Sequence, residues 1–358
     1  MMKEKAYRVA FVGDVVMDAQ RGVPDSVRTL VASFDADLVV ANSEIPLTER
    51  GTRAAKFVAW RASPAVAKEM KALGFDGVTL ANNHALDYGC QGLEDTLAAF
   101  HAAGVKTVGM GKNVDDALSP AVFTFDASNR VAILSVACTL PLGFDAGADR
   151  PGVAPVRVST RYEFDPMDIQ DEPGCLPTFI HTRADPGDVA RLCREIRRLK
   201  TEGHLAVVCI HWGNAFQKRL AQYQQPLARA LGEAGCDLVL GHHPHTIHGI
   251  EVIDGMPVLY SVGNFIMDKK TVAHGESDLP SGLATQWTMS PEGLAAVVDT
   301  VDGEVVGLRV VPVLLDDDGF PARASGAAGE EILQDIETYP PGPVDWQRER
   351  DTAVLRLR

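Results

Sequence analysis

Six short apolar runs each end directly in a cluster of polar side chains, and this pattern constrains the fold more than any other feature of the sequence. The runs with their clusters are "YRVAFVGD" (7–14), "ADLVVANSE" (36–44), "GVTLANNHALD" (77–87), "LAVVCIHWGN" (205–214), "DLVLGHHPH" (237–245) and "PVLYSVGNF" (257–265). Helix-like segments that end before a glycine, such as Gly74 and Gly104, lie between several of these runs. Continuous apolar strands that alternate with helices predict an α/β fold whose sheet is buried on both faces.

The placement of the polar clusters predicts one shared site. In sheets of this kind, ligands bind beyond the carboxyl ends of the strands. Clusters that are far apart in the sequence are therefore expected to converge in space.

Composition narrows the classes of partner. The chain has 358 residues, 46% of them hydrophobic, and a net charge of −14. Such acidity argues against a nucleic-acid partner, whose phosphates require a basic face. An anionic substrate, small or polymeric, stays open because bound metal ions supply local positive charge. The six cysteines form no C-x-x-C pair, which predicts free and mostly buried thiols.

Nothing in the sequence indicates a membrane span. The N-terminus enters a predicted strand almost at once, and no run of about 18 apolar residues occurs. The expected location is the cytoplasm, and the oligomeric state is not indicated.

Three segments set the expected domain organisation. Residues 145–185, rich in Pro, Gly and Asp, read as a long loop or insertion. Residues 285–315 alternate like strands around Asp302-Gly303, which predicts an antiparallel hairpin on the core. We therefore expect one domain over 1–315 and a C-terminal extension over 316–358, with one helix candidate at 329–338.

Four of the ten histidines lie within residues 242–248. In an extended turn, side chains at i and i+2 point to one side, so His243 and His245 are the best pair of metal ligands. The pairing can also be shifted by one residue. With His243 and His245 as the ligands, His242 and His248 support them or contact the substrate.

The third cluster offers a proton-transfer residue. His84 follows two asparagines, Asn82 and Asn83, and Asp87 is placed either to orient its imidazole or to cap the next helix. His84 is free to protonate a leaving group. His84 and Asp87 are therefore the candidate catalytic residues.

Carboxylate, amide and imidazole groups make up the predicted metal site. Its candidate ligands are Asp14, Glu44, Asn83, His211, His243 and His245. This mixed set suits Mn, Zn or Fe better than Mg or Ca. Six ligands exceed one tetrahedral site, and a carboxylate can bridge two ions about 3.5–4 Å apart. Each strand-end residue taken alone also has a structural explanation, such as a helix cap for Asp14.

The ordered motifs resemble the bacterial capsule-synthesis family known as CapA or poly-gamma-glutamate synthesis (PGA_cap) proteins, within the calcineurin-like metallophosphoesterase superfamily. The matching motifs are "GD" (13–14), "ANSE" (41–44), "LANNHALDYG" (80–89), "HWG" (211–213), "GHHPHTIHGIE" (241–251) and "YSVGNF" (260–265). The resemblance implies an α/β/β/α sandwich with mixed central sheets and one or two divalent transition-metal ions.

The resemblance also implies individual roles. Asp14 would bind the first metal, Glu44 would bridge, and Asn83 with His211 would bind the second. His243 and His245 would serve the two ions, and His84 resembles the catalytic acid. Candidate substrate contacts are Asn42, Asn82, His242, His248 and Asn264.

The sequence departs from the family pattern at three points. Val16 stands where the superfamily's D-x-H motif has histidine, which predicts a weak first metal site or a single ion. Ala215 follows Asn214 where the family often has glutamate. Many members begin with a membrane anchor, which is not expected here.

Three functions are compatible with these residues. The first is a soluble metal-dependent hydrolase that cleaves a phosphoester with metal-activated water. The second is an enzyme acting on the amide or carboxylate of a glutamate-like substrate. The third is a non-catalytic metal-binding subunit of a polymer biosynthesis complex.

Overall fold

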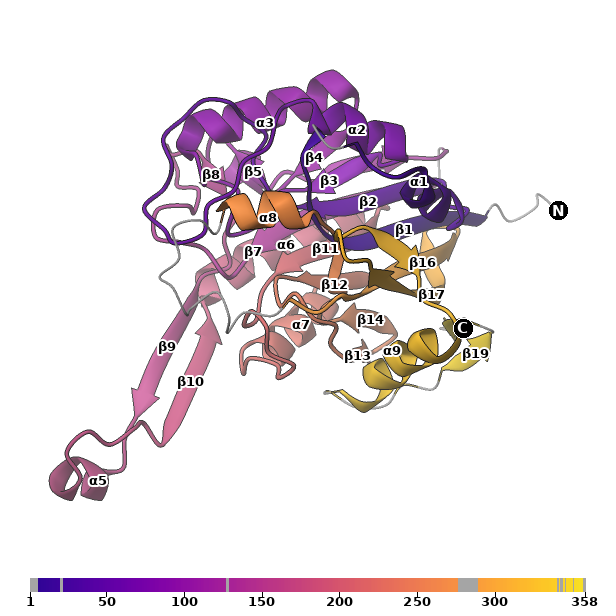
Figure 1. Cartoon of the computed structure of the whole chain (residues 1–358). Helices are drawn as coiled ribbons and strands as arrows, with labels where there is room; N and C mark the ends of the chain where they lie inside the picture. The colour runs from indigo at the N-terminus through magenta and orange to yellow at the C-terminus, as the bar shows by residue number, and fades with distance from the viewer. Residues whose placement is uncertain are drawn as a thin grey trace.

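A computed structural model describes residues 6–19, 22–126, 129–275, 289–339, 341, 344, 346–349 and 351–356. Two mixed β-sheets lie face to face at its centre, with helices on the outer face of each (Figure 1). The predicted α/β/β/α sandwich is confirmed.

The first sheet has the strand order β19-β20-β17-β16-β1-β2-β3-β4, with β15 paired to β1 and β18 to β17. Strands β1 to β4 and β15 run parallel, whereas β16, β17, β18, β19 and β20 join by antiparallel pairing. The strands are β1 (Ala6–Val16), β2 (Leu38–Ser43), β3 (Gly77–Thr79), β4 (Lys106–Val108), β15 (Asn264–Met267), β16 (Glu292–Val301), β17 (Glu304–Leu315), β18 (Pro321–Arg323), β19 (Gln347–Glu349) and β20 (Thr352–Arg356).

The second sheet has the order β13-β14-β12-β11-β7-β6. Its central strands β7, β11, β12 and β14 are parallel, and β6 and β13 pair antiparallel at the two edges. The strands are β6 (Ala121–Thr124), β7 (Arg130–Ala137), β11 (Leu205–His211), β12 (Leu238–His242), β13 (Ile250–Ile253) and β14 (Met256–Leu259). A further short pair joins β5 (Met110–Gly111) to β8 (Gly152–Val153).

Alternation along the strands explains why both sheets are buried on two faces. Val9 of β1 and Val207 of β11 belong to one apolar cluster, which fills the space between the sheets. Their neighbours Ala10 and Val208 belong to two different clusters on the outer faces. Each central strand therefore supplies two cores, which requires a continuous apolar run.

Helices cover the outer faces. The outer face of the first sheet packs on α1 (Asp25–Ala32), α2 (Val66–Leu73) and α3 (Gly89–Ala103), and that of the second on α6 (Pro186–Thr201) and α7 (Gln224–Glu233). As predicted, α2 and α3 end at glycines in the left-handed conformation, Gly74 (φ 103°) and Gly104 (φ 71°). Shorter helices are α4 (Val114–Ala117) and α8 (Lys269–Gly275). Among the helices that the structure describes, none combines the length and apolar character needed to cross a membrane.

The predicted antiparallel hairpin is formed by β16 and β17. Its turn residues Asp302 (φ 49°) and Gly303 (φ 79°) both have positive φ, as a two-residue hairpin turn requires. The first part of the predicted range, 285–288, lies outside the described residues.

The segment 145–185, predicted as a long loop or insertion, contains regular secondary structure. It contains a two-stranded antiparallel hairpin of β9 (Val158–Glu163) and β10 (Phe179–Ala184), with the short helix α5 (Pro166–Asp171) between them. This hairpin projects from the body of the molecule (Figure 1). Because its strands carry mostly polar residues, they lack the apolar run that marks the strands of the core.

The C-terminal extension contributes to the first sheet. It supplies β18, β19 and β20, and α9 (Gly326–Thr338) covers the predicted helix at 329–338. The boundary between 315 and 316 stays a prediction. All six cysteines are unpaired, and Cys193, Cys209 and Cys236 are buried while Cys90 is exposed.

Candidate metal centre

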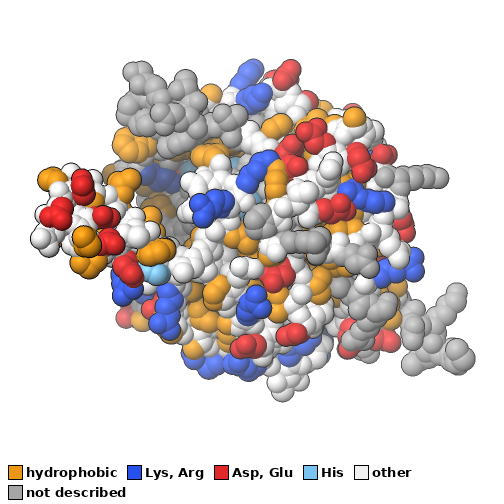
Figure 2. Space-filling view, turned by 90° about the horizontal axis from the view of Figure 1, so that it is seen from below, with side chains coloured by type: hydrophobic (Ala, Val, Ile, Leu, Met, Phe, Trp, Pro, Cys, Tyr) orange, Lys and Arg blue, Asp and Glu red, His pale blue; other side chains and the backbone are white. Residues whose placement is uncertain are grey.

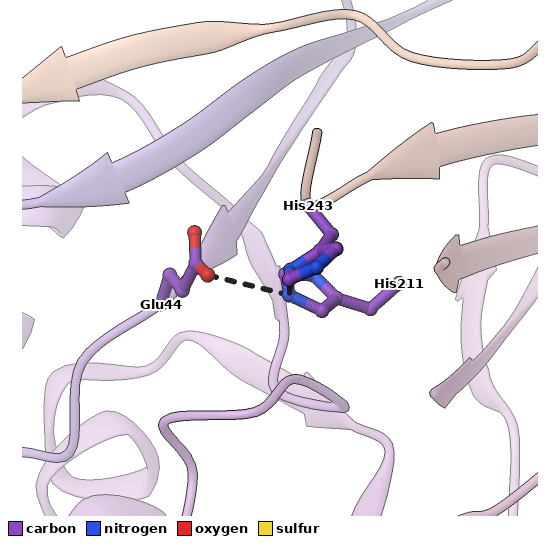
Figure 3. Close-up of side chains that lie close together, drawn as sticks. All are labelled: Glu44, His211 and His243. Atoms are coloured by element: carbon purple, nitrogen blue, oxygen red, sulfur yellow. Dashed lines mark hydrogen bonds and ion pairs between the residues drawn. The ribbon is translucent and has the colours of Figure 1, made fainter. Parts of the chain in front are cut away.

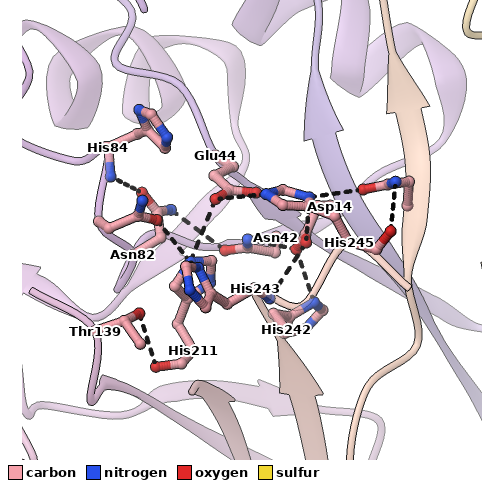
Figure 4. Close-up of polar contacts among 12 residues, drawn as sticks. Asp14, Asn42, Glu44, Asn82, His84, Thr139, His211, His242, His243 and His245 are labelled. Atoms are coloured by element: carbon pink, nitrogen blue, oxygen red, sulfur yellow. Dashed lines mark hydrogen bonds and ion pairs between the residues drawn. The ribbon is translucent and has the colours of Figure 1, made fainter. Parts of the chain in front are cut away.

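The parallel strands of both sheets end at the same place, and there five of the six predicted metal ligands come together (Figure 4). The sixth, Asn83, is in contact with His211. Asp14 lies in β1, Glu44 directly follows β2 and Asn83 follows β3. His211 ends β11 and is paired in register with His242, which ends β12. The expected convergence beyond the strand ends is therefore observed.

One group of donors, which we call the His211 half, consists of Glu44, His211 and His243 (Figure 3), together with Asn83. The Nε2 atom of His211 lies 2.8 Å from Asn83 Oδ1, 3.1 Å from His243 Nδ1 and 3.3 Å from Glu44 Oε1. Three ligand atoms from three other chain segments thus lie within 3.3 Å of this one imidazole nitrogen. Nitrogen and oxygen lone pairs gather in this way around a bound cation.

The second group, the Asp14 half, consists of Asp14, Glu44 and His245. His245 Nδ1 lies 3.6 Å from Asp14 Oδ2, and its Nε2 lies 3.8 Å from Glu44 Oε1. Glu44 belongs to both halves. It occupies the position that a bridging carboxylate takes between two ions.

The two carboxylates are equally buried but have opposite electrostatic surroundings. Asn42 donates a hydrogen bond to Asp14 Oδ1 (2.8 Å), and His242 Nδ1 lies 3.0 Å from the same atom. Burial alone raises the pKa of Asp14, but the interactions with His242, His245 and Asn42 outweigh it and lower that pKa. Burial, followed by the charge of Asp14, raises the pKa of Glu44 well above its usual value.

Glu44 fits a bound cation. Both of its carboxylate oxygens are buried, and neither has a hydrogen-bond partner among the described residues. An isolated buried carboxylate is strongly unfavourable unless a proton or a cation neutralises it. The donor set of carboxylate, amide and imidazole groups suits a divalent transition metal.

The two imidazoles of the His211 half are held neutral in the absence of a cation. Burial, with a smaller contribution from neighbouring histidines, lowers the pKa of His243 to about 3 and that of His211 well below its usual value. Neutral imidazoles keep a free lone pair, which is the form that ligates metal.

The turn that carries the histidine pair is strained. His243 has φ 95° and His245 has φ 52°, both in the left-handed region that residues other than glycine seldom adopt. Close packing keeps the strand ends in place, since a Cβ at Gly241 would lie 2.0 Å from the carbonyl oxygen of Tyr260. The strain is confined to the two residues that reach the candidate centre.

His84 lies beside the centre (Figure 4) and takes part in a hydrogen-bonded network with Asp87 and Trp60. Its Nδ1 is 2.7 Å from Asp87 Oδ2, which also accepts a hydrogen bond from the Trp60 backbone N–H (2.7 Å). Lys56 Nζ lies farther from Nδ1, at 3.3 Å. The shorter contact, to a carboxylate that accepts, places the proton on His84 Nδ1 and leaves the lone pair on Nε2. Helix α3 begins at Gly89 with Tyr88 as its N-cap, so Asp87 orients His84 and does not cap that helix.

Lys56 completes this network and was not singled out by sequence reasoning. Its ammonium donates to Asp87 Oδ1 (2.7 Å) and to the Asn83 carbonyl (2.8 Å). Burial lowers the pKa of Lys56, although Asp87 opposes the shift. A lysine in a loop between two apolar residues gives no sequence signal that distinguishes it from an ordinary surface lysine.

A pocket of about 320 Å³ opens next to the centre. Its lining combines apolar side chains with the groups able to react, namely Lys56, Phe57, Val58, Trp60, Asn83, His84, Ala215, Phe216, His243, His245 and Met289. Trp60 stacks on His84 (centroids 3.9 Å apart) and Phe216 stacks on His245 (5.6 Å). Small apolar pockets with a few converging polar groups are the usual form of a substrate site.

The five predicted substrate contacts lie elsewhere. All are buried, and none lines this pocket: Asn42, Asn82, His242, His248 and Asn264. Asn264 Oδ1 is 2.9 Å from His245 Nδ1, and His248 Nε2 donates to the Gln217 carbonyl (2.7 Å). Their hydrogen bonds support the ligands and the loops around them, so direct contact with a substrate stays a prediction.

Two of the departures from the family pattern can be placed. Val16 is fully buried and packs in the apolar cluster on the outer face of the first sheet, so it offers no donor to the Asp14 half. Ala215 lines the pocket. At both positions an apolar side chain takes the place of a polar one.

Comparison with known proteins gives a consistent result. The family model described as "Bacterial capsule synthesis protein PGA_cap" matches residues 8–269. The chain is 30% identical over 270 residues to the PGA biosynthesis protein CapA of Bacillus subtilis, covering 73% of this chain and 63% of the relative. It is 29% identical over 362 residues to the capsule biosynthesis protein CapA of Bacillus anthracis, covering 98% and 77%.

A third relative is the probable polyglutamine synthesis accessory protein of Mycobacterium tuberculosis, 31% identical over 281 residues, with 77% of this chain and 66% of the relative covered. The chain thus spans just under two thirds of the length of the Bacillus subtilis and Mycobacterium tuberculosis relatives. Among solved structures, the protein TT1561 of Thermus thermophilus is similar at a TM-score of 0.41 and 8% identity, covering 83% of this chain and 100% of that one, which is too weak for a conclusion.

The family model covers the strands whose ends form the candidate centre, from β1 to β15. The chain therefore belongs to the bacterial capsule synthesis protein PGA_cap family, within the metallophosphoesterase-like superfamily.

Proposed function

We propose that this protein is a metal-dependent hydrolase that acts on an anionic substrate, most directly a phosphoester, in the synthesis of a capsule or poly-gamma-glutamate polymer. The observation that carries the proposal is Glu44, a buried carboxylate without a hydrogen-bond partner among the described residues, shared by two groups of metal donors. Glu44, Asn83, His211 and His243 would hold one ion, and Asp14, Glu44 and His245 a second. When bound, Mn, Zn or Fe supplies a Lewis acid that polarises a substrate oxygen and lowers the pKa of water.

The protein's own groups account for binding and proton transfer. Lys56 lines the pocket as a cation and attracts an anionic substrate toward the centre. Trp60 and Phe216 fix the rings of His84 and His245 by stacking, and they exclude water from one side of each. The pocket thus brings a negatively charged group against His84 and the donor cluster.

His84 is the proposed proton-transfer residue, and Asp87 positions it. Burial lowers the pKa of His84 to about 4 even though Asp87 opposes the shift, so the empty pocket contains a neutral imidazole. Its Nε2 has no hydrogen-bond partner among the described residues, while Nδ1 is fixed by Asp87. An anionic substrate raises the pKa of a neighbouring imidazole, which prepares His84 to donate a proton to the leaving group.

Hydrolysis assays test the proposal. The full chain, loaded separately with Mn²⁺, Zn²⁺ or Fe²⁺, is offered a nitrophenyl phosphodiester and a nitrophenyl phosphomonoester, with metal-stripped protein as the blank. His84→Ala is expected to lower kcat by about 10²- to 10⁴-fold, the usual contribution of a general acid or base. His101→Ala, at an exposed histidine of α3, is the matched control and should leave the rate unchanged. Absence of hydrolysis in all metal forms would refute the phosphoester assignment.

A second candidate is favoured by Lys56 and by the names of the relatives. A lysine in the pocket suits a carboxylate as well as a phosphate, and the relatives are named for PGA or polyglutamine synthesis. The same centre can polarise the carbonyl of a glutamyl amide. Incubation with gamma-glutamyl peptides, followed by mass spectrometry, separates this activity from phosphoester cleavage.

The Mycobacterium tuberculosis relative is named an accessory protein. Stoichiometric metal without hydrolysis of either substrate class would therefore favour a non-catalytic, metal-binding subunit.

A further inference from the structure

The hairpin of β9 and β10 with α5 at its tip, which we call the arm, lacks a core of its own. Every residue from 159 to 187 is at least partly exposed, and the most exposed apolar side chains include Met167 (72%), Ile169 (62%) and Leu176 (83%). A two-stranded hairpin without packing on another element is only marginally stable in water. The arm therefore presents an apolar surface that a partner can cover.

One face of the arm is continuous with a pocket at its base. Cross-strand neighbours share a face, so Tyr162 with Ile180 and Thr160 with Thr182 lie on the same side. Tyr162 and Ile180 are 59% and 56% exposed. Thr182, nearer the base, is part of the pocket lining. This face is apolar near the tip and carries two threonines nearer the base, where it reaches the pocket.

The pocket at the base, which we call the base pocket, lies between α6 and α7 and has a volume of about 470 Å³. Its floor is apolar and includes Val189, Cys193 and Leu227, and its rim includes Arg194 and Arg197. Among the described residues, neither of these arginines forms an ion pair with a carboxylate. The lining also contains Arg183 and one carboxylate, Glu233, so three arginines face a single acid. The base pocket therefore offers both an apolar floor and a net positive charge.

The tip of the arm has the complementary chemistry. Residues 164–180 contain no Lys or Arg but four carboxylates, at Asp165, Asp168, Asp171 and Glu172. Figure 2 shows acidic and apolar side chains together on the lobe at its left edge, which is the arm. An acidic, apolar tip matches a basic, apolar pocket on the same chain.

A tip cannot enter the base pocket of its own chain, because the extended strands carry it away. Strand β9 has six residues, which at about 3.3 Å each gives roughly 20 Å between base and tip. The base itself is fixed, since Arg157 forms two hydrogen bonds of 2.7 Å with the buried carboxylate of Asp188. The complementary pair can therefore meet only between two molecules.

We propose that this chain forms a two-fold symmetric dimer by arm exchange, in which each acidic tip occupies the base pocket of a second copy. When two arms lie antiparallel, the tip of each is beside the base of the other, so both contacts form at once. Such self-complementary pairing is the usual geometry of a homodimer. It also covers the apolar faces around Tyr162 and Ile180.

Substitutions that reverse the charges of the base pocket and of the tip test the dimer. Variant A carries Arg194→Glu and Arg197→Glu in the base pocket, and variant B carries Asp168→Lys and Asp171→Lys at the tip. Both change exposed or partly exposed residues, and thermal unfolding confirms that each variant folds. Sedimentation velocity and light scattering of the full chain at tens of micromolar give the oligomeric state.

The wild type is expected to be a dimer, and each variant alone a monomer with a dimerisation Kd raised at least about tenfold. In variant A the pocket repels the acidic tip, and in variant B the two substitutions cancel the four negative charges of the tip. A mixture of A and B should recover a dimer, because the acidic tip of A then meets the basic pocket of B, and the lysines introduced in B meet the glutamates introduced in A. Arg28→Glu with Lys68→Glu, exposed on α1 and α2, is the control and should stay dimeric. Three results would each overturn the proposal: a monomeric wild type, a dimer that A and B leave intact, or a mixture that stays monomeric. A monomeric wild type would indicate that a different protein covers the arm.

Discussion

The two halves of the candidate centre share Glu44 but differ in how their other donors are satisfied. In the Asp14 half, Asp14 accepts a hydrogen bond from Asn42, and His245 Nδ1 is held by Asn264. In the His211 half, His211 Nε2 faces only other ligand atoms, from Asn83, His243 and Glu44. The apolar Val16 also gives the Asp14 half no donor at the position where the superfamily motif has histidine.

The difference shows which half depends on a cation. Donors that already have protein partners gain less from a metal, whereas donors that converge only on one another need one to relieve their desolvation. We therefore expect the His211 half to hold its ion tightly and the Asp14 half to bind a weaker second ion. Each prediction below tests this asymmetry.

Glu44→Gln should have the largest effect because Glu44 serves both halves. The substitution keeps the shape of the side chain and removes its charge, so the number of metal ions bound per chain should fall below one. The rate of hydrolysis should fall at least about 100-fold, because a Lewis acid lowers the activation barrier by several kcal/mol. Metal content is measured by elemental analysis after dialysis. Glu69→Gln on α2 is the control, and a variant that keeps its metal would refute the shared role.

His211→Ala and His245→Ala should separate the halves. The first should abolish the tight binding event in a metal titration, and the second should remove only the weak one. The two affinities are expected to differ by more than about tenfold, or 1.4 kcal/mol. Equal losses in the two variants would show that the halves are equivalent.

The sequence predicts the sandwich and its ligands because both depend on local patterns. Apolar runs identify β1, β2, β11 and β12. The carboxyl ends of parallel strands meet at one edge of a sheet, whatever the conformation of the loops that follow them. The roles of Asn264 and Lys56 could not be predicted in this way. Each acts through a residue distant in the chain, Asn264 on His245 and Lys56 on Asp87, and such pairings appear only when the loops are folded.

The arm was missed for a related physical reason. Strands of the core are recognised by their buried apolar residues, and β9 and β10 bury almost none. Backbone pairing alone leaves no pattern in the sequence. The Pro, Gly and Asp content of 145–185 correctly marks turns, but it does not reveal the strands between them.

Asn264→Ala should have an intermediate effect, limited to the Asp14 half. Loss of the partner of His245 Nδ1 frees the ring to rotate, and removal of such a supporting hydrogen bond weakens metal binding by about 10- to 100-fold. The weak binding event of the titration should shift by that factor while the tight one is unchanged. Asn113→Ala, at the cap of α4, should change neither.

The smallest expected effect is the pH dependence of the free energy of unfolding of the metal-free protein. The contributions of Glu44 and Asp14 to this free energy should have opposite signs. The folded protein raises the pKa of Glu44 above 4.5, so its destabilising effect is absent below that pH and grows as pH rises toward the folded-state pKa. The folded protein lowers the pKa of Asp14 below 3.8, so its stabilising effect is present at neutral pH and is lost as pH falls below that value.

Urea unfolding from acidic to neutral pH, with Glu44→Gln and Asp14→Asn as references, isolates each contribution as a difference from the wild type. The stability of the wild type relative to Glu44→Gln should decrease as pH rises, and relative to Asp14→Asn it should decrease as pH falls. Saturating Mn²⁺ should remove the first dependence, because the cation replaces the proton as the partner of Glu44. Parallel slopes for the two variants would mean that the carboxylates are electrostatically alike, and the asymmetry between the halves would then rest on the number of ligands alone.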